Sequence, residues 1–224
     1  MGFSEEWNNQ YKANQQMSIW PWSDLVSYFM RYAKPLGYPL KVLELGCGAG
    51  ANIPFFLRMG VDYYALEGSD VIVAQLHERF PELKDRISCT DFTQIIPFAE
   101  KFDVIVDRAS LTHNPTADIK KCLALVGNKL RPGGKFIGID WFSTAHADYK
   151  IGTSTLDPYT NANYEDGQFA DVGYVHFSDK QHLEELFCDF NFEVMEHKVV
   201  QKEYPCTGHA FASWNFVAIK KGVR

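Results

Sequence analysis

Apolar and polar positions fall in blocks along this chain, and the blocks predict strands and helices in alternation. Short apolar runs at residues 42–45, 63–66, 86–90, 102–106 and 135–139 have the length and composition of buried strands. Between them, apolar residues at helical spacing predict helices over 52–59, 70–80 and 115–130, the last one capped by Asn114. Strands that alternate with helices at short spacing indicate a parallel sheet covered by helices on both faces.

The two ends of the chain depart from this alternation. Residues 23–33 predict an amphipathic helix with Leu25, Phe29 and Tyr32 facing inward. Residues 143–177 show no clear period and predict a long irregular insert, which is followed by a helix that Ser178 opens. The runs at 192–203 and 211–220 are joined too closely for a crossover helix, so they predict an antiparallel hairpin.

Composition narrows the class of protein. With 224 residues, 46% of them hydrophobic, the chain can form one domain with a full core. A net charge of -6 gives no electrostatic reason to bind nucleic acid. No apolar run is long enough to cross a bilayer and the first residues are polar and acidic, so we expect a cytoplasmic protein without a membrane partner. Five scattered cysteines without a C-x-x-C pair predict buried thiols and no metal site: Cys47, Cys89, Cys122, Cys188 and Cys206.

The segment with the clearest chemical meaning is 42–50, VLELGCGAG, in which a strand runs into glycines spaced two apart. Glycine tolerates positive φ, so such a loop can turn tightly and present backbone amides to a nucleoside. Glu67 ends the next apolar run, where a carboxylate can accept both hydroxyls of a ribose. The alternative is structural, because the glycines can be turn residues and Glu67 and Asp91 can cap the helices that follow them.

Five motifs in order resemble those of class I S-adenosylmethionine-dependent methyltransferases, over residues 40–220. They are the glycine loop with Glu44, the acid Glu67, the pair 91–92 (DF), the strand 102–107 (FDVIVD) and the turn 130–135 (LRPGGK). The terminal hairpin is similar to the last two strands of that fold and separates it from nicotinamide-binding relatives. The resemblance implies an α/β fold: a doubly wound, mostly parallel seven-stranded sheet with helices on both faces and a C-terminal antiparallel hairpin.

The resemblance also implies S-adenosylmethionine as cofactor and a set of residues that bind it. The loop glycines would let the backbone approach the methionine portion, Glu67 would accept the ribose hydroxyls, and Asp91 would accept from the adenine amine. The full set implied is Glu44, Gly46, Cys47, Gly48, Glu67, Gly68, Asp91, Phe92 and Asp107.

Methyl transfer from a sulfonium is an in-line displacement that needs alignment and, for a hydroxyl acceptor, a base. We expect His113, shortly after the fourth strand, and Asp107, at the end of that strand, to be catalytic. The alternative for His113 is a structural one, in which it helps to cap the helix after Asn114.

We expect the acceptor to contact the two segments that are additional to the core fold, the N-terminal segment and the insert. We expect a single methyltransferase domain over 1–224, with an N-terminal helical lid at 1–38 and an acceptor-site insert at 143–177. His146 and His176 are lesser candidates for the site, and packing alone would also explain the aromatic residues near the N-terminus. The expected substrate-binding residues are Trp20, Asp140, Trp141, Tyr149 and Tyr164.

The sequence therefore predicts an enzyme, a small-molecule methyltransferase, most simply one that O-methylates a sugar or a related metabolite, acting as a monomer or homodimer. A methyltransferase for protein side chains or carboxylates is an alternative, which an extended peptide groove would indicate. A protein that binds S-adenosylmethionine without catalysis is another. The hairpin argues against a nicotinamide oxidoreductase.

Overall fold

A computed structural model describes residues 5–33 and 38–222, which fold around one seven-stranded sheet. Its strand order is β3-β2-β1-β4-β5-β10-β9. The first five strands are mutually parallel: β1 (Lys41–Leu45), β2 (Asp62–Glu67), β3 (Ile87–Cys89), β4 (Phe102–Arg108) and β5 (Leu130–Phe142). The hairpin β9 (Phe190–Gln201) and β10 (Ala210–Lys220) adds to β5 in antiparallel orientation. The predicted fold class is confirmed.

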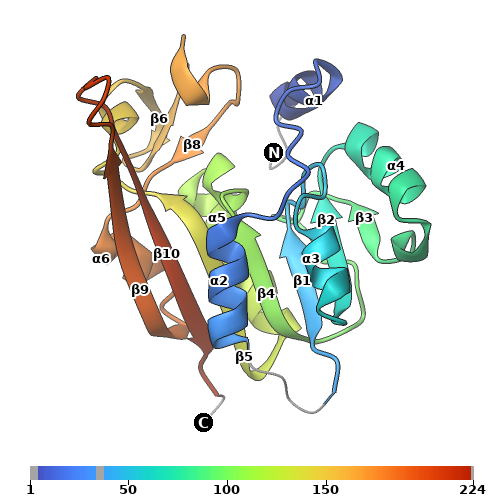
Figure 1. The fold of residues 1–224 in the computed structure, drawn as a ribbon. Helices are drawn as coiled ribbons and strands as arrows, with labels where there is room; N and C mark the ends of the chain where they lie inside the picture. The colour runs from blue at the N-terminus through green and yellow to red at the C-terminus, as the bar shows by residue number, and fades with distance from the viewer. Residues whose placement is uncertain (1–4, 34–37, 223–224) are drawn as a thin grey trace.

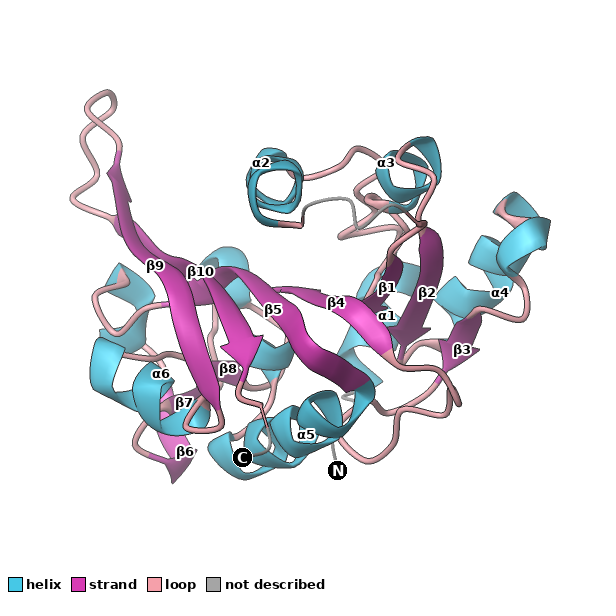
Figure 2. Ribbon diagram, turned by 90° about the horizontal axis from the view of Figure 1, so that it is seen from below, coloured by secondary structure: helices cyan, strands magenta, loops and turns pink. Residues whose placement is uncertain are grey.

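Helices cover both faces of the sheet (Figure 2). On one face lie α2 (Ser23–Tyr32), α3 (Ile53–Arg58) and α4 (Asp70–Arg79); on the other lie α5 (Thr116–Lys129) and α6 (Lys180–Leu186). Side chains alternate along each strand, so neighbouring residues serve two separate cores. In β1, Val42 packs in the core under α2, α3 and α4, whereas Leu43 and Leu45 pack in the core under α5 and α6.

The N-terminal segment holds two helices, of which the sequence predicts one. In α2, Leu25 and Phe29 are buried as predicted, while Tyr32 is only partly buried and Tyr28 is buried. A short helix that the sequence did not predict, α1 (Glu5–Lys12), lies at the end of the molecule where β1 and β2 finish (Figure 1). Residues 1–4 and 34–37 of the predicted lid lie outside the described residues.

The insert is not irregular, and that prediction is wrong. It forms a small antiparallel sheet of β6 (Thr153–Asp157), β7 (Thr160–Ala162) and β8 (Val175–His176). Strands this short and polar give little periodic signal, and they pack instead on a third apolar cluster that includes Phe142, Phe169 and Phe177. Four 3₁₀ turns complete the described elements: η1 (Pro81–Leu83), η2 (Leu111–His113), η3 (Ala147–Lys150) and η4 (Gly167–Phe169).

Two predicted helix caps are wrong. Asn114 does not cap α5, because its amide donates to backbone carbonyls of the preceding turn. The first amide of α5, on Thr116, instead donates to Asp157 Oδ2 at 3.0 Å, a carboxylate from the insert. At α6 the cap is Asp179 rather than Ser178. No helix within 5–33 and 38–222 has the length and apolar character required to span a membrane.

Candidate active site

A cavity of about 410 Å³ lies where β1, β2 and β4 end, the place where ligands bind in open α/β sheets. Helix α1 stands over this end of the sheet, and the insert lies at the same end (Figure 1). The cavity has a polar part, built by the loops after β1, β2 and β3, and an aromatic part, built by α1, β5 and the insert.

The glycine loop forms the floor of the polar part. Gly46 has φ +62°, and a β-carbon there would lie 2.3 Å from the Ser110 β-carbon, so only glycine fits. Gly48 has φ +51°, and a β-carbon on it would meet nothing closer than the Tyr11 hydroxyl of α1, at 3.4 Å. Both glycines line the cavity; Gly46 packs closely against Ser110, whereas the space beside Gly48 is open as far as Tyr11.

Glu67, the last residue of β2, is 4% exposed and lines the cavity. Its Oε2 accepts from the Gly48 amide at 2.8 Å and its Oε1 from the Ser69 amide at 3.1 Å. Burial raises the pKa of Glu67, and these backbone hydrogen bonds oppose that rise. Each carboxylate oxygen can still accept one more hydrogen bond, so Glu67 can serve two neighbouring hydroxyls.

Glu44 lies at the other side of the loop and also lines the cavity. The amide of Asn52 donates to its Oε1 at 2.7 Å and the Tyr63 hydroxyl to its Oε2 at 2.5 Å. Burial nevertheless raises the pKa of Glu44 to about 7. A cationic ligand group beside it would favour the ionised form.

Asp91 and Phe92, after β3, form the far wall of the polar part together with Gly68. Asp91 Oδ1 accepts from the amide and the hydroxyl of Thr93, at 2.9 and 2.6 Å, which fixes the carboxylate in the turn. Phe92 is buried and lines the cavity.

His113 is the basic group at the aromatic part of the cavity. Its Nδ1 lies 3.1 Å from the carbonyl oxygen of Tyr174, and because a carbonyl only accepts, Nδ1 carries the proton. Nε2 therefore holds a lone pair, and it has no hydrogen-bond partner among the described residues. Burial lowers the pKa of His113 to about 4, which keeps the imidazole neutral at physiological pH. The Trp7 ring of α1 packs edge-on against the His113 ring, with 4.8 Å between the ring centroids.

Asp107 does not reach the cavity. Its side chain is fully buried, and its Oδ1 accepts from the Ser110 hydroxyl and, at 3.0 Å, from the Leu111 amide. Burial raises its pKa to about 6. Neither Asp107 Oδ2 nor the indole nitrogen of Trp141 makes a hydrogen bond of ordinary geometry with a described residue. The nearby indole N–H nevertheless lowers the pKa of Asp107 and so opposes part of the rise that burial causes. Asp107 holds the turn that leads to His113.

None of the five predicted substrate-binding side chains lines the cavity. Trp141 is fully buried against Phe136, Phe187 and Phe216, and Trp20 is 76% exposed outside it. The remaining three are Asp140, Tyr149, whose hydroxyl donates to the Pro158 carbonyl at 3.0 Å, and Tyr164, which is buried in the core of the insert.

Asp140 acts on the cavity through Arg108. Their salt bridge measures 3.0 Å between Arg108 Nη2 and Asp140 Oδ2, and the guanidinium lies 3.6 Å above the Trp22 ring. Arg108 and Trp22 both line the cavity. The sequence predicts Trp22 only as part of the N-terminal lid and does not single out Arg108, although Arg108 ends the fourth strand, where ligands bind in open α/β sheets.

The aromatic part of the cavity comes mainly from residues that the sequence does not single out one by one, although Trp7, Met17, Phe169 and Val172 lie in the predicted lid and insert. They share flat or apolar faces, and several come from segments that meet only in the folded chain: Trp7, Met17, Phe142, Phe169, Val172 and Phe211. Helix α1 is held over the polar part by the Asn8 side chain, which lies 2.5 Å from the Ser69 hydroxyl. The N-terminal segment therefore lines part of the cavity, and its helix α1 lies over the polar part.

In sequence, this chain is similar to methyltransferases. A family model described as a methyltransferase domain matches residues 42–134. Ubiquinone biosynthesis O-methyltransferase from Coxiella burnetii is 30% identical over 119 residues, 51% of this chain and 47% of that protein. The protein of the same description from Bradyrhizobium sp. is 28% identical over 113 residues, 49% of this chain and 44% of that one. The chain thus spans about half the length of the curated relatives that it matches.

Solved structures extend the likeness of fold to nearly the whole chain. A methyltransferase from Methanosarcina mazei, described as dependent on S-adenosylmethionine, superposes with a TM-score of 0.66 at 16% identity, covering 90% of this chain and 99% of that one. The 1,6-didemethyltoxoflavin-N1-methyltransferase of Burkholderia thailandensis gives 0.64 at 19% identity, covering 97% and 85%. Residues 42–134 therefore match a methyltransferase domain, and the described residues have the Rossmann-like fold of S-adenosylmethionine-dependent methyltransferases.

Proposed function

We propose that this protein is an S-adenosylmethionine-dependent O-methyltransferase that acts on a small molecule inside the cavity. The observation that carries the proposal is the position of His113, a neutral imidazole with a free Nε2 lone pair in the same cavity as the glycine loop and Glu67. The curated relatives are named as O-methyltransferases, which supports oxygen as the atom methylated.

The residues present fit the cofactor. Glu67 has acceptor capacity left for a pair of ribose hydroxyls, and Gly48 leaves the space that a side chain would fill. Asp91 and Phe92 would hold the adenine, and Glu44, a carboxyl with a raised pKa, would respond to a nearby ammonium. The bound cofactor supplies an electrophilic methyl group.

The chain's own task is to position the acceptor and remove its proton. The bound cofactor would supply the methyl group and keep the electron pair on its sulfur, while His113 Nε2 would accept the proton that the acceptor hydroxyl loses. The Nδ1–H bond to the Tyr174 carbonyl keeps the ring in the tautomer that can accept this proton. Trp7 and α1 cover the site and exclude water from it.

The aromatic wall supports an acceptor with at least one flat or apolar face. Trp7, Trp22 and Phe142 offer ring faces or edges, and Arg108 offers a cation that Asp140 already pairs. A sugar or related metabolite with an apolar ring face meets this description, and so does a phenolic ring. Both are hydroxyl acceptors, and product analysis separates them.

The two alternatives are less well supported. A protein acceptor would need an extended groove, whereas this cavity is covered by α1 and walled by the insert. A binding protein without catalysis would have no use for His113, whose imidazole is held in one tautomer with its lone pair unused.

The test is transfer of label from methyl-labelled S-adenosylmethionine into a fractionated cell extract. The proposal predicts label in the small-molecule fraction, on oxygen, and none in protein. Label in protein alone, or on nitrogen, sulfur or carbon of the product, would contradict it. Tight cofactor binding without transfer to any fraction would favour the non-catalytic alternative.

A further inference from the structure

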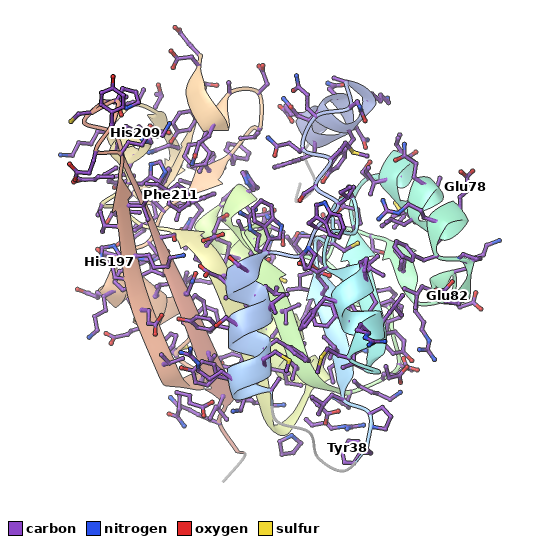
Figure 3. All side chains as sticks on the ribbon, in the orientation of Figure 1. Tyr38, Glu78, Glu82, His197, His209 and Phe211 are labelled. Carbon is purple, nitrogen blue, oxygen red and sulfur yellow. The ribbon has the colours of Figure 1, made fainter. Side chains whose placement is uncertain are left out.

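Three potential metal ligands meet at the tip of the hairpin, outside the cavity. His146 and Asp148 lie in the segment after β5. His209 lies directly before β10 (Figure 3). Asp148 Oδ1 is 2.7 Å from His209 Nε2, and Asp148 Oδ2 is 4.0 Å from His146 Nδ1. One ligand atom from each of the three lies within 4.8 Å of the others.

The tautomer of His146 suits a ligand. Its Nδ1 accepts from the Asp148 backbone amide at 3.1 Å, so Nδ1 carries no proton, and an ion that binds there would replace this hydrogen bond. The proton of the neutral ring is then on Nε2, which lies 3.1 Å from the terminal amide of Gln168 and donates to the amide oxygen once that group is oriented to accept. This arrangement, with the outer nitrogen donating to a neighbour, is the one that metal-binding histidines adopt.

The charge of Asp148 also points to a cation. Asp148 is only 6% exposed, and within the described part of the chain no lysine or arginine forms a salt bridge with it. Its Oδ2 makes no hydrogen bond to a described residue, so a buried carboxylate relies on His209 alone for a partner. A buried carboxylate with so little compensation is costly unless a cation binds it.

We propose that His146, Asp148 and His209 bind one Zn²⁺ ion. Two imidazoles and one carboxylate are ligands of zinc, with a water in the fourth position, whereas Mg²⁺ and Ca²⁺ prefer oxygen ligands throughout. Bonds of about 2.0–2.1 Å place tetrahedral ligands ~3.3 Å apart, between the 2.7 and 4.0 Å separations seen here. His209 is exposed, so its side chain can adjust to the ion.

The ion would tie the hairpin to the wall of the cavity. The His146 ring lies 5.1 Å from the Phe211 ring and 5.3 Å from the Phe169 ring, and both of these line the cavity. Zinc would therefore join the start of the insert, which holds His146 and Asp148, to the hairpin, which holds His209. The site stands apart from the cofactor loop, and its existence does not depend on the proposed reaction.

Calorimetric titration of chelator-treated protein with Zn²⁺ tests the site. We expect one ion per chain and no binding of Mg²⁺ in the same range. Asp148→Asn and His209→Gln should each weaken Zn²⁺ at least about 100-fold, because losing even an outer partner of a ligand costs 10- to 100-fold. His209 is exposed, so that variant should fold normally.

Two control variants isolate the cluster. His197→Gln removes another histidine of the same hairpin, one that contacts Ser143 and not Asp148 (Figure 3). Cys206→Ser removes an exposed thiol three residues before His209. Both should keep the affinity of the unmodified protein. The proposal is overturned if Zn²⁺ does not bind, if both cluster variants bind it normally, or if Cys206→Ser abolishes binding.

A second readout follows the ion directly. With Co²⁺ in place of Zn²⁺, nitrogen and oxygen ligands give visible absorption without a thiolate charge-transfer band. Backbone amides of 144–150 and 205–210 should exchange more slowly with Zn²⁺ bound, since the ion joins these segments. A thiolate band, or unchanged exchange in a zinc-loaded sample, would show that the ion binds elsewhere.

Discussion

At the scale of single residues, Glu67 is the group on which cofactor binding should depend most. Its carboxylate faces two backbone N–H donors, so Glu67→Gln would turn an amide NH₂ toward one of them. Hydrogen bonds to charged groups contribute about 1.5–3 kcal/mol, and we expect S-adenosylmethionine to bind roughly 10- to 100-fold more weakly. Calorimetry measures this. Asp70→Asn, an exposed acid nearby on α4, should bind normally; equal loss in both variants would refute the assignment.

His113 should govern turnover and leave binding unchanged. His113→Gln should lower kcat about 10²- to 10⁴-fold, because general base catalysis contributes that much, with the cofactor Kd unchanged. His77→Gln, whose ring lies on α4 beside the Ile87 carbonyl, is the matched control and should turn over normally. A normal kcat in His113→Gln would remove the histidine from the mechanism.

The pH profile gives an independent check on His113. Its pKa is lowered to about 4 by burial, so the base form persists from about pH 5 upward. The kcat/KM profile should therefore show no inflection near 6.5, the ordinary value for histidine. An inflection there, absent in His113→Gln, would mean that His113 titrates as an exposed group.

Some site residues could be predicted from the sequence because they end strands whose positions are readable. Glu44, Glu67 and Asp91 all fall at such ends and line the cavity. Trp141 shows where this fails. Ile137 and Ile139 face the core under α2, yet Trp141, two residues on, faces the opposite core. A bulge in β5 reverses the alternation, because Ile139 and Asp140, the latter with φ +55°, lie opposite the single residue Asn215 of β10, and Phe142 takes the place at the cavity.

At the scale of elements, the insert stabilises a helix of the main fold. Asp157 Oδ2 accepts from the first amide of α5, a cap supplied from 41 residues further along the chain. Asp157→Ala should lower the free energy of unfolding by about 1–2 kcal/mol, the usual cost of a lost cap. Urea unfolding measures this, with exposed Asp166→Ala as control. Identical stability in the two variants would show that the contact contributes nothing.

The same cap predicts a pH effect. Burial tends to raise the pKa of Asp157, but the N–H groups of Tyr159 and Thr116 and the Thr160 hydroxyl lower it below its usual value. Asp157 therefore contributes to the free energy of unfolding above about pH 4, near its pKa in the unfolded chain. That contribution is lost as the pH falls through the lower pKa of Asp157 in the folded protein. The stability difference between Asp157→Ala and the unmodified protein should shrink below about pH 4. A constant difference down to pH 2 would contradict the cap.

Helices and strands with a clear apolar period in the sequence were predictable, and elements without such a period were not. The parallel strands, α2, α4 and the terminal hairpin have apolar periods that the sequence displays, and the structure confirms them. Helix α1 has eight residues and a polar sequence, and it is held by contacts such as Asn8 with Ser69. Strands β6 to β8 depend in the same way on distant partners. The division of function between lid and insert stays a prediction.

At the scale of the whole molecule, cofactor binding should stabilise the fold. A ligand that binds only the native state adds about 2.7 kcal/mol to the free energy of unfolding when its concentration is 100 times its Kd. For a chain of this size, that raises Tm by roughly 5–10 °C. Thermal unfolding with S-adenosylmethionine measures the shift. Reduced dinucleotide should give none, and a comparable shift with that compound would favour a nicotinamide site.

We propose that this cavity moves a methyl group from S-adenosylmethionine to oxygen. The most direct test of this proposal is a single-turnover experiment, in which protein loaded with methyl-labelled cofactor is mixed with the small-molecule fraction that contains the acceptor. We expect label to pass to an acceptor oxygen with the unmodified protein, and about 10²- to 10⁴-fold more slowly with His113→Gln at equal cofactor occupancy. Label that stays on the cofactor in the unmodified protein, or that moves equally fast in both, would contradict it.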